Sequence, residues 1–271
     1  MIEALQALLF GLLIGSFLNV CIHRWPRDLS VVRPRSHCPS CDKMIAWYDN
    51  VPVLSYVLLG AKCRYCKAQI SWRYPVVELM TGVLFFNFVY GAGGLTPRAA
   101  KMCVFSALLL GLLFADLEER ILPDELTKGG LAIGFVFSVF VAVPGTVARD
   151  LAMISGFDLG DRAASIAEAA LGAVLPSFLL WAAGAAYSKI RHKEGLGFGD
   201  VKLIAMIGAF LGFQETVLIW LIGSVSGAVL GFGYIKLTAQ DPATYELPYG
   251  TFLCAAALIV AVFEHQLVAI S

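Results

Sequence analysis

The sequence predicts an all-α polytopic membrane protein with about eight transmembrane helices and one small extramembrane loop domain. Of its 271 residues, 59% are hydrophobic and only 15% are charged, whereas soluble domains average about 45–50% and about 25%. The apolar residues also gather into eight segments separated by polar stretches. The formal net charge is zero and indicates no partner by itself. We expect the chain to contact membrane lipid and no nucleic acid.

The eight apolar segments differ in length. A transmembrane helix needs about 20 mostly apolar residues, and seven of the segments come near this length. The segment 201–213 is shorter, so we expect it either to start inside the membrane interface or not to cross fully. The first segment lacks the basic start and the cleavage site of a signal peptide, so we expect a retained helix. The stretch 145–164 is expected to be an outer loop with room for a short helix. The eight segments are residues 2–22, 76–94, 99–117, 126–144, 165–188, 201–213, 216–236 and 249–269.

The distribution of lysine and arginine predicts the orientation in the membrane. The loop 23–75 carries nine of these residues. With eight crossings, the regions on the side of this loop hold 16 basic residues, and the opposite side holds 4. This excess predicts that the loop 23–75 is cytoplasmic and that both termini lie outside.

Four cysteines in this loop have the spacing of a metal site. Cys38 and Cys41 form one Cys-x2-Cys pair, and Cys63 and Cys66 form a second pair after 21 intervening residues. Two such pairs fit a tetrahedral zinc ion with four thiolate ligands, and a small loop would draw much of its folding energy from the metal. Four thiolates leave no open position, so we expect structural zinc. Two disulfides or four unrelated thiols are the alternatives, and a reducing cytoplasm disfavours disulfides.

Two aspartates at the ends of apolar segments are candidate catalytic residues. Asp116 ends the segment 99–117, and Asp200 precedes the segment 201–213. An ionisable side chain at the edge of a span is costly and is therefore a candidate functional group. The predicted topology places both at similar depth on the cytoplasmic side, where they could share one proton as an aspartyl protease dyad. The charged member would activate water, and the protonated member would donate to the scissile carbonyl. As an alternative, Asp116 is an interfacial residue in a polar turn.

The residues around Asp200 have expected roles of their own. Gly197 and Gly199 would let a peptide pass close to Asp200. Lys202 would favour the ionised form of a nearby acid, or extend to lipid headgroups. As alternatives, Asp200 is the N-cap of the helix 201–213, and Asp124 is the N-cap of the fourth helix, 126–144.

Five sequence blocks occur in order between residue 15 and residue 252. They are GSFLNVCIHRWP (15–26), CPSC…DNVPVLSY…GAKCRYCKAQISWRYPVVEL (38–79), ADLEERILPDELT (115–127), GLGFGDVKL (195–203) and LPYGTF (247–252). Together these blocks resemble the bacterial type IV prepilin leader peptidase/N-methyltransferase family, a group of GxGD membrane aspartyl proteases. The GxGD signature alone is weak, but combined with the cysteines and the aspartate spacing it is highly specific.

The resemblance implies an activity and a location. It implies that Asp116 and Asp200 are the two catalytic aspartates and that Asp124 has a supporting role. The family cleaves the basic leader of type IV prepilins and pseudopilins after a glycine, and then methylates the new N-terminal amine with S-adenosylmethionine. It implies a multi-pass protein of the bacterial cytoplasmic (inner) membrane whose active site faces the cytoplasm. The expected domains are a first transmembrane helix (1–22), a cytoplasmic zinc-binding domain associated with methyl transfer (23–75) and a transmembrane aspartyl protease domain (76–271).

The methyl-donor site is less clearly marked in the sequence. No glycine-rich Rossmann fingerprint is present, and the family's frequent Gly-Gly-x-Cys run is Gly60-Ala61-Lys62-Cys63 here. The candidates lie in or beside the cysteine loop, and for each of them hydrogen bonding within the loop or contact with headgroups is the alternative. These candidates are Asn19, His23, Arg24, Asn50, Arg73 and Glu78.

Two other classes of function are alternatives. One is a proton-coupled transporter that uses Asp116 and Asp200 as relay carboxylates, and the other is a non-enzymatic zinc-binding sensor. Transporters usually place such acids near the middle of the bilayer and often contain paired repeats. Here both acids lie at the edge of the apolar segments, and no repeat is visible in the sequence. A sensor would tolerate replacement of both aspartates.

Overall fold

The structure is a computed structural model that describes residues 1–192, 197–238 and 247–270, with side chains up to residue 263. Within these ranges the secondary structure is helical, apart from two isolated β-bridges. The chain divides into two compact units, Met1–Gly111 with His265–Ser271, and Leu112–Glu264. Helix α4 (Pro97–Glu119) begins in the first unit and ends in the second.

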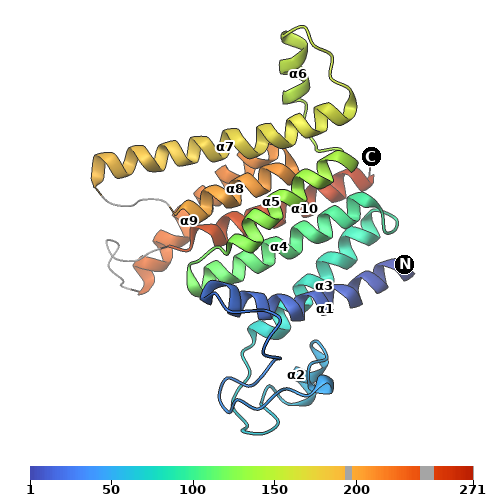
Figure 1. The fold of residues 1–271 in the computed structure, drawn as a ribbon, viewed down its shortest axis with the longest axis vertical. Helices are drawn as coiled ribbons and strands as arrows, with labels where there is room; N and C mark the ends of the chain where they lie inside the picture. The colour runs from blue at the N-terminus through green and yellow to red at the C-terminus, as the bar shows by residue number, and fades with distance from the viewer. Residues whose placement is uncertain (193–196, 239–246, 271) are drawn as a thin grey trace. The chain divides into compact units, whose positions relative to one another are not determined.

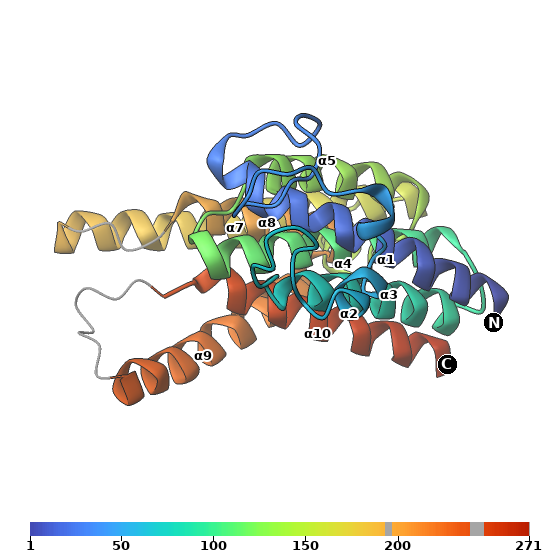
Figure 2. The same cartoon turned by 90° about the horizontal axis from the view of Figure 1, so that it is seen from below.

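The first unit is built on two helices that lie side by side, α1 (Ile2–Arg24) and α3 (Arg73–Gly91), as Figures 1 and 2 show. Their backbones approach closely because small residues face the neighbouring helix. A Cβ added at Gly15 would lie 2.6 Å from the Cα of Glu78, so only glycine fits there. The chain between the two helices forms the cysteine loop, which contains η1 (Trp25–Arg27), η2 (Trp47–Asp49) and α2 (Leu54–Leu58).

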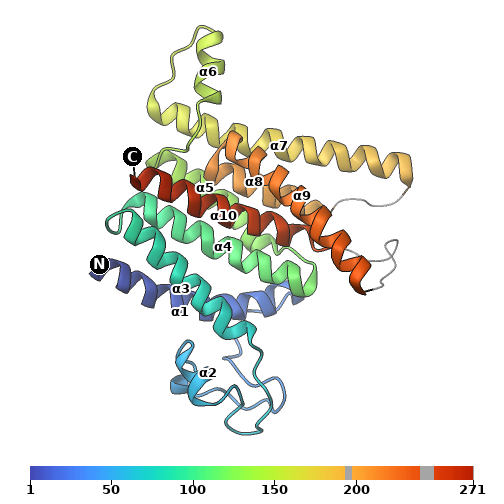
Figure 3. The same cartoon turned by 180° about the vertical axis from the view of Figure 1, so that it is seen from behind.

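The second unit is arranged around the short helix α8 (Phe198–Leu211), which packs against α5, α7 and α9 (Figure 3). Eight of the nine residues from Leu203 to Leu211 are buried in α8, so neighbouring helices rather than lipid cover it. Gly208 allows this packing, because an added Cβ would overlap the backbone of Gly172 in α7. The other helices of the unit are α5 (Asp124–Phe140), α6 (Val147–Ile154), α7 (Asp161–Arg191), α9 (Phe213–Thr238) and α10 (Tyr249–Ile270).

Each of the eight predicted segments overlaps a separate helix, and the short helix expected within 145–164 is α6. The all-α, multi-pass fold class is therefore confirmed. The count of eight spans is not confirmed, because five helices in the described ranges are long and apolar enough to cross a membrane. These five are α1, α3, α4, α7 and α9. The helices α5 and α8 have 17 and 14 residues.

A buried carboxylate holds the C-terminal end of α8, which is the end opposite to Asp200. Glu168 of α7 is 2% exposed. It accepts hydrogen bonds from the backbone N–H groups of Ala148 (2.8 Å) and Phe213 (3.2 Å), which lie at the N-termini of α6 and α9. The first N–H groups of a helix have no hydrogen-bond partner inside the helix. This one carboxylate accepts such N–H groups from two helices and thereby fixes the turn after α8.

Candidate functional site

Asp116 lies in the last turn of α4 and is 5% exposed. Its Oδ2 atom accepts two hydrogen bonds from Thr251 of α10, one from the backbone N–H (2.6 Å) and one from the hydroxyl group (2.8 Å). The backbone donor belongs to the first turn of α10, where N–H groups have no partner inside the helix. The start of α10 therefore holds the Asp116 carboxylate in one orientation and stabilises its negative charge.

Asp200 is the third residue of α8 and is half-buried. The helix begins at Phe198 with Gly197 as its N-cap and has no side-chain capping hydrogen bond. The alternative in which Asp200 is the N-cap is therefore wrong. Asp200 lies close enough to Asp116 for their charges to interact, and close enough to Tyr249 for its charge to reach the phenol group. The fold thus brings the two predicted aspartates within electrostatic range of each other, although 83 residues separate them in the sequence.

Leu122 fills the space between the helix ends that carry this site. A Cβ added at Gly199 would lie 3.2 Å from the Cβ of Leu122. A Cβ added at Gly250 would lie 3.0 Å from Leu122 Cδ1 and 3.2 Å from Asp116 Cγ. The two glycines therefore allow the starts of α8 and α10 to close around one leucine side chain. The same contact keeps Gly250 directly against the Asp116 carboxyl group.

Asp124 and Lys202 form an ion pair that joins the starts of α5 and α8. Asp124 is the first residue of α5 and follows the N-cap Pro123, so it is not itself the predicted N-cap. Its carboxylate also pairs with Lys128 (2.6 Å). The hydrogen bonds from Lys128 and then Lys202 hold the pKa of Asp124 below its usual range. Lys202 therefore does favour the ionised form of a nearby acid, and that acid is Asp124.

The four cysteine sulfurs of the loop come together, with all Sγ atoms within 4.8 Å of one another. The sulfurs of Cys38 and Cys66 are 3.8 Å apart. A tetrahedral zinc ion with Zn–S bonds of about 2.3 Å requires sulfurs about 3.8 Å apart, so these residues fit the metal. All seven cysteines are free thiols, and the structure therefore contains neither of the two alternative disulfides.

Each cysteine pair is presented by the same backbone turn. The N–H of Asp42 donates to the carbonyl of Cys38 (2.9 Å), and the N–H of Lys67 donates to the carbonyl of Cys63 (3.1 Å). Both Asp42 and Lys67 have positive φ, at 54° and 59°. An isolated antiparallel bridge closes each turn at equivalent positions. The loop therefore contains a short structural repeat that is built on the two Cys-x2-Cys pairs.

Among the candidate methyl-donor residues, Asn19 and Glu78 lie on the facing sides of α1 and α3. Asn19 is 1% exposed, and its amide nitrogen donates to the carbonyls of Gly15 (3.2 Å) and Tyr74 (3.1 Å). Its Oδ1 atom is buried and accepts no hydrogen bond. Glu78 is also buried and accepts a hydrogen bond from the backbone N–H of Val53 (2.7 Å). The pair offers acceptor atoms in a buried environment.

The other four candidates are dispersed. Arg24 donates to the carbonyls of Ser30 (2.8 Å) and Pro34 (2.7 Å), so it organises the first part of the loop. The imidazole of His23 lies 3.1 Å from the guanidinium of Arg27. The remaining two are Asn50, which is exposed, and Arg73, which is buried with its guanidinium 4.9 Å from the ring of Tyr74.

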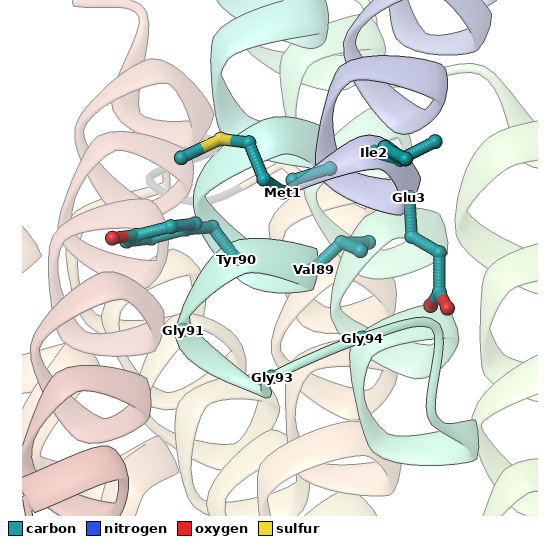
Figure 4. Close-up of a pocket in the computed structure, with 9 residues that line it drawn as sticks. Met1, Ile2, Glu3, Val89, Tyr90, Gly91, Gly93 and Gly94 are labelled. Atoms are coloured by element: carbon teal, nitrogen blue, oxygen red, sulfur yellow. The ribbon is translucent and has the colours of Figure 1, made fainter.

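A pocket lies at the other end of the first unit, between the start of α1 and the end of α3 (Figure 4). Its lining contains one carboxylate, that of Glu3. This carboxylate already accepts a hydrogen bond from the backbone N–H of Leu95 (2.6 Å). The pocket therefore lacks the paired acids of the Asp116 site.

The site combines three regions to which the sequence analysis assigned a role and one residue, Thr251, to which it assigned none. The aspartates, the Leu-Pro-Asp segment and the GxGD turn were all predicted to matter. Thr251 was missed, although it lies in the block LPYGTF, and only its position directly after Gly250 could have drawn attention to it. Residues 195 and 196 of the GLGFGDVKL block lie outside the described residues.

Fold and site together define the class, a multi-pass helical membrane protein with a buried and a half-buried aspartate in electrostatic range of each other and with a four-cysteine loop. Residues 9–91 match the Bacterial Peptidase A24 N-terminal domain, and residues 103–232 match the Type IV leader peptidase family. The chain therefore belongs to the type IV leader peptidase family, which confirms the resemblance found in its sequence.

Three relatives carry the name prepilin leader peptidase/N-methyltransferase. The protein from Stutzerimonas stutzeri is 34% identical over 98% of this chain and 92% of its own length. The protein from Pseudomonas aeruginosa is 32% identical, with 97% and 91% covered. The protein from Myxococcus xanthus is 39% identical over 85% of this chain, which spans 62% of that relative. No solved structure matches the chain.

Proposed function

We propose that this chain cleaves the leader peptide of type IV prepilins or pseudopilins with Asp116 and Asp200 and then N-methylates the new N-terminus. The observation that carries the proposal is the buried Asp116 carboxylate, which is held by two hydrogen bonds from Thr251 and lies within electrostatic range of Asp200. The names of the relatives support both reactions. Two carboxylates in this relation suit hydrolysis by one charged and one protonated acid.

The hydrogen bonds suggest which acid has which role. Thr251 stabilises the charged form of Asp116, so Asp116 is the base that removes a proton from the attacking water. Asp200, kept protonated beside that charge, donates to the oxygen of the scissile carbonyl. The water oxygen adds to the carbonyl carbon to give a tetrahedral intermediate. The carbon–nitrogen bond then breaks, the proton held by Asp116 passes to the leaving amine, and the proton on the former carbonyl oxygen returns to Asp200. The products are a leader carboxylate and a free N-terminal amine.

The proposed location follows from charge. We place the ends of α4 and α8 at the cytoplasmic face, as the lysine and arginine distribution predicts. A substrate with a basic leader and an apolar helix would then keep its leader in the cytoplasm and its helix in the bilayer. Its scissile bond would lie at the interface, where Asp116 and Asp200 are expected. Glu118 and Glu125 are exposed near the site and would attract a basic leader.

The cysteine loop and the adjacent helix ends are proposed to serve methylation. The four thiolates of Cys38, Cys41, Cys63 and Cys66 would hold zinc, which would stabilise the loop without contacting substrate. S-adenosylmethionine, when bound, supplies the methyl group. Asn19 and Glu78 are the residues best suited to hold its cationic amine, because the Oδ1 of Asn19 is a buried acceptor that still has capacity for a donor. We retain residues 23–75 and 76–271 as the proposed methylation and protease domains.

A single assay tests both reactions. The purified protein in detergent is incubated with a prepilin peptide, with and without S-adenosylmethionine, and the products are read by mass spectrometry. Asp116→Asn and Asp200→Asn should each abolish cleavage while keeping the thermal midpoint of the parent. Asp158→Asn, an exposed aspartate in the loop between α6 and α7, is the matched control and should cleave normally. Full cleavage by either dyad variant would refute the dyad.

The zinc proposal has its own test. Cys38→Ser or Cys63→Ser should release zinc, measured by elemental analysis of the purified protein, and should damage methylation more than cleavage. Cys103→Ser, a buried cysteine away from the loop, should keep the metal. Absence of stoichiometric zinc in the parent protein would contradict the proposal.

A further inference from the structure

The short helix α2 in the cysteine loop has the reverse of the usual amphipathic arrangement. Its polar residue Ser55 is buried, and the hydroxyl group donates to the carbonyl of Tyr48 (3.1 Å). Its apolar residues Leu54, Val57 and Leu58 are 53%, 67% and 75% exposed. A helix at the surface of a soluble domain faces its apolar side inward. A cluster of large apolar side chains facing outward indicates a surface that meets something other than water.

The start of α2 lies alongside the spanning helices of its own unit and not beyond their ends. Val53, the N-cap of α2, donates its N–H to Glu78 (2.7 Å). Glu78 lies roughly 7.5 Å along α3 from its first residue, Arg73. The side chain of Ser16 lies close enough to act on the same carboxylate, and Ser16 lies roughly 12 Å along α1 from its last residue, Arg24. Since α1 and α3 are both long and apolar enough to cross a membrane, the chain folds back beside them before α2 begins.

The rest of the loop is suited to the surface of a membrane. Residues 23–75 hold nine basic and three acidic side chains, and basic clusters beside a span are attracted to anionic headgroups. Trp47 and Trp72 are 75% and 66% exposed. Tryptophan is enriched at the boundary between lipid and water, where its ring meets both.

We infer that α2 lies in the bilayer interface, with Leu54, Val57 and Leu58 inserted at the boundary between headgroups and acyl chains. The cysteine domain is then held flat against the membrane and does not project into the cytoplasm as a free loop. Short apolar faces of this kind bind membranes by burying apolar area together with electrostatic attraction to anionic lipid. The inference concerns the position of the loop relative to the membrane and does not depend on the proposed enzymatic function.

Site-specific photocrosslinking in the full chain tests whether α2 contacts lipid. A benzophenone amino acid is placed at Leu58 and, in a second variant, at Val57. Each protein is reconstituted in vesicles of phosphatidylcholine and phosphatidylglycerol, irradiated and analysed for lipid adducts by mass spectrometry. Leu13, which is 58% exposed on α1, serves as the lipid-facing reference. Asp42, an exposed charged residue of the first cysteine turn, serves as the water-facing reference.

We expect lipid adducts at positions 57 and 58 in yields close to that at Leu13 and several-fold above that at Asp42. Yields at both positions no higher than at Asp42 would overturn the inference, because the face would then be in water. Adducts to another part of the same chain, in place of lipid, would also overturn it, because protein would then cover α2. Two label positions guard against a local effect of the probe, and an unchanged thermal midpoint shows that each variant is folded.

Discussion

Thr251→Val is the sharpest test of the carboxylate site, because it removes only the hydroxyl group, which donates to Asp116 and lies at a longer distance, 3.4 Å, from the Leu113 carbonyl oxygen. Valine has nearly the shape of threonine but lacks the hydroxyl group that donates to Asp116 at 2.8 Å. The backbone N–H bond at 2.6 Å remains. A hydrogen bond to a charged group contributes about 1.5–3 kcal/mol, which corresponds to a loss of roughly 10- to 200-fold in rate. We expect the loss mainly in kcat, because in the proposed mechanism Asp116 acts on the water and not on substrate binding.

The assay is steady-state cleavage of a prepilin peptide in detergent, with Thr251→Ser as the matched control. Serine retains the hydroxyl donor, so we expect this variant to stay within a few-fold of the parent protein. Equal activity of Thr251→Val and the parent would refute the role given to this hydrogen bond. An equal loss in the serine and valine variants would show that the site needs the whole threonine side chain and not the donor alone, because serine lacks only the methyl group and valine lacks only the hydroxyl group. Thermal midpoints of both variants must match the parent for either comparison to count.

Three further predictions concern packing and stability, and all are read from thermal unfolding in detergent. Gly208→Ala should destabilise the protein, because its Cβ would overlap the backbone of α7, whereas Gly129→Ala has open space and should be neutral or stabilising by about 0.5–1 kcal/mol. Asp124→Asn should lower the midpoint at neutral pH by removing the ion pair with Lys202. The pKa of Asp124 is lowered on folding. The stability that its carboxylate contributes is therefore complete above the ordinary aspartate pKa and is lost as the pH falls through the pKa of Asp124 in the folded protein. Glu168→Gln should cost about 1–3 kcal/mol, because the amide replaces one of two buried acceptor oxygens with a donor.

Helix positions could be predicted from the sequence because apolar runs of membrane length dominate it. The ends could not, because hydropathy follows the hydrocarbon layer while backbone hydrogen bonding continues beyond it. Helix α7 shows this clearly: the apolar run 165–188 lies inside a helix that starts at Asp161 and ends at Arg191. In the same way α8 starts three residues before its apolar run, so that Asp200 is inside the helix and not ahead of it.

The two aspartates could be predicted because an acid at the edge of an apolar segment is rare and costly. Their partners could not, since those contacts exist only in the folded chain. Thr251 is 135 residues from Asp116 in the sequence, and nothing local marks a threonine as a donor to a distant carboxylate. Leu122 is an ordinary apolar residue until Gly199 and Gly250 are seen to close around it. Tertiary packing therefore supplies the part of the site that residue types alone do not reveal.

Because α7 and α8 have unequal lengths, Asp200 does not reach as far along the bundle as the end of its neighbour α7. Gly172 of α7 packs against Gly212 at the end of α8. From this contact α7 continues for roughly 28 Å to Arg191, whereas α8 returns only roughly 18 Å to Asp200. The end of α7 at Arg191 and the start of α8 at Phe198 are only seven residues apart in the sequence, so both lie toward the same side. Asp200 therefore lies roughly 10 Å short of the end of its neighbour. In the proposed function, the short α8 would place this carboxylate at the membrane interface, where the scissile bond of a membrane-embedded substrate is expected, and a helix of full spanning length would carry it into bulk water.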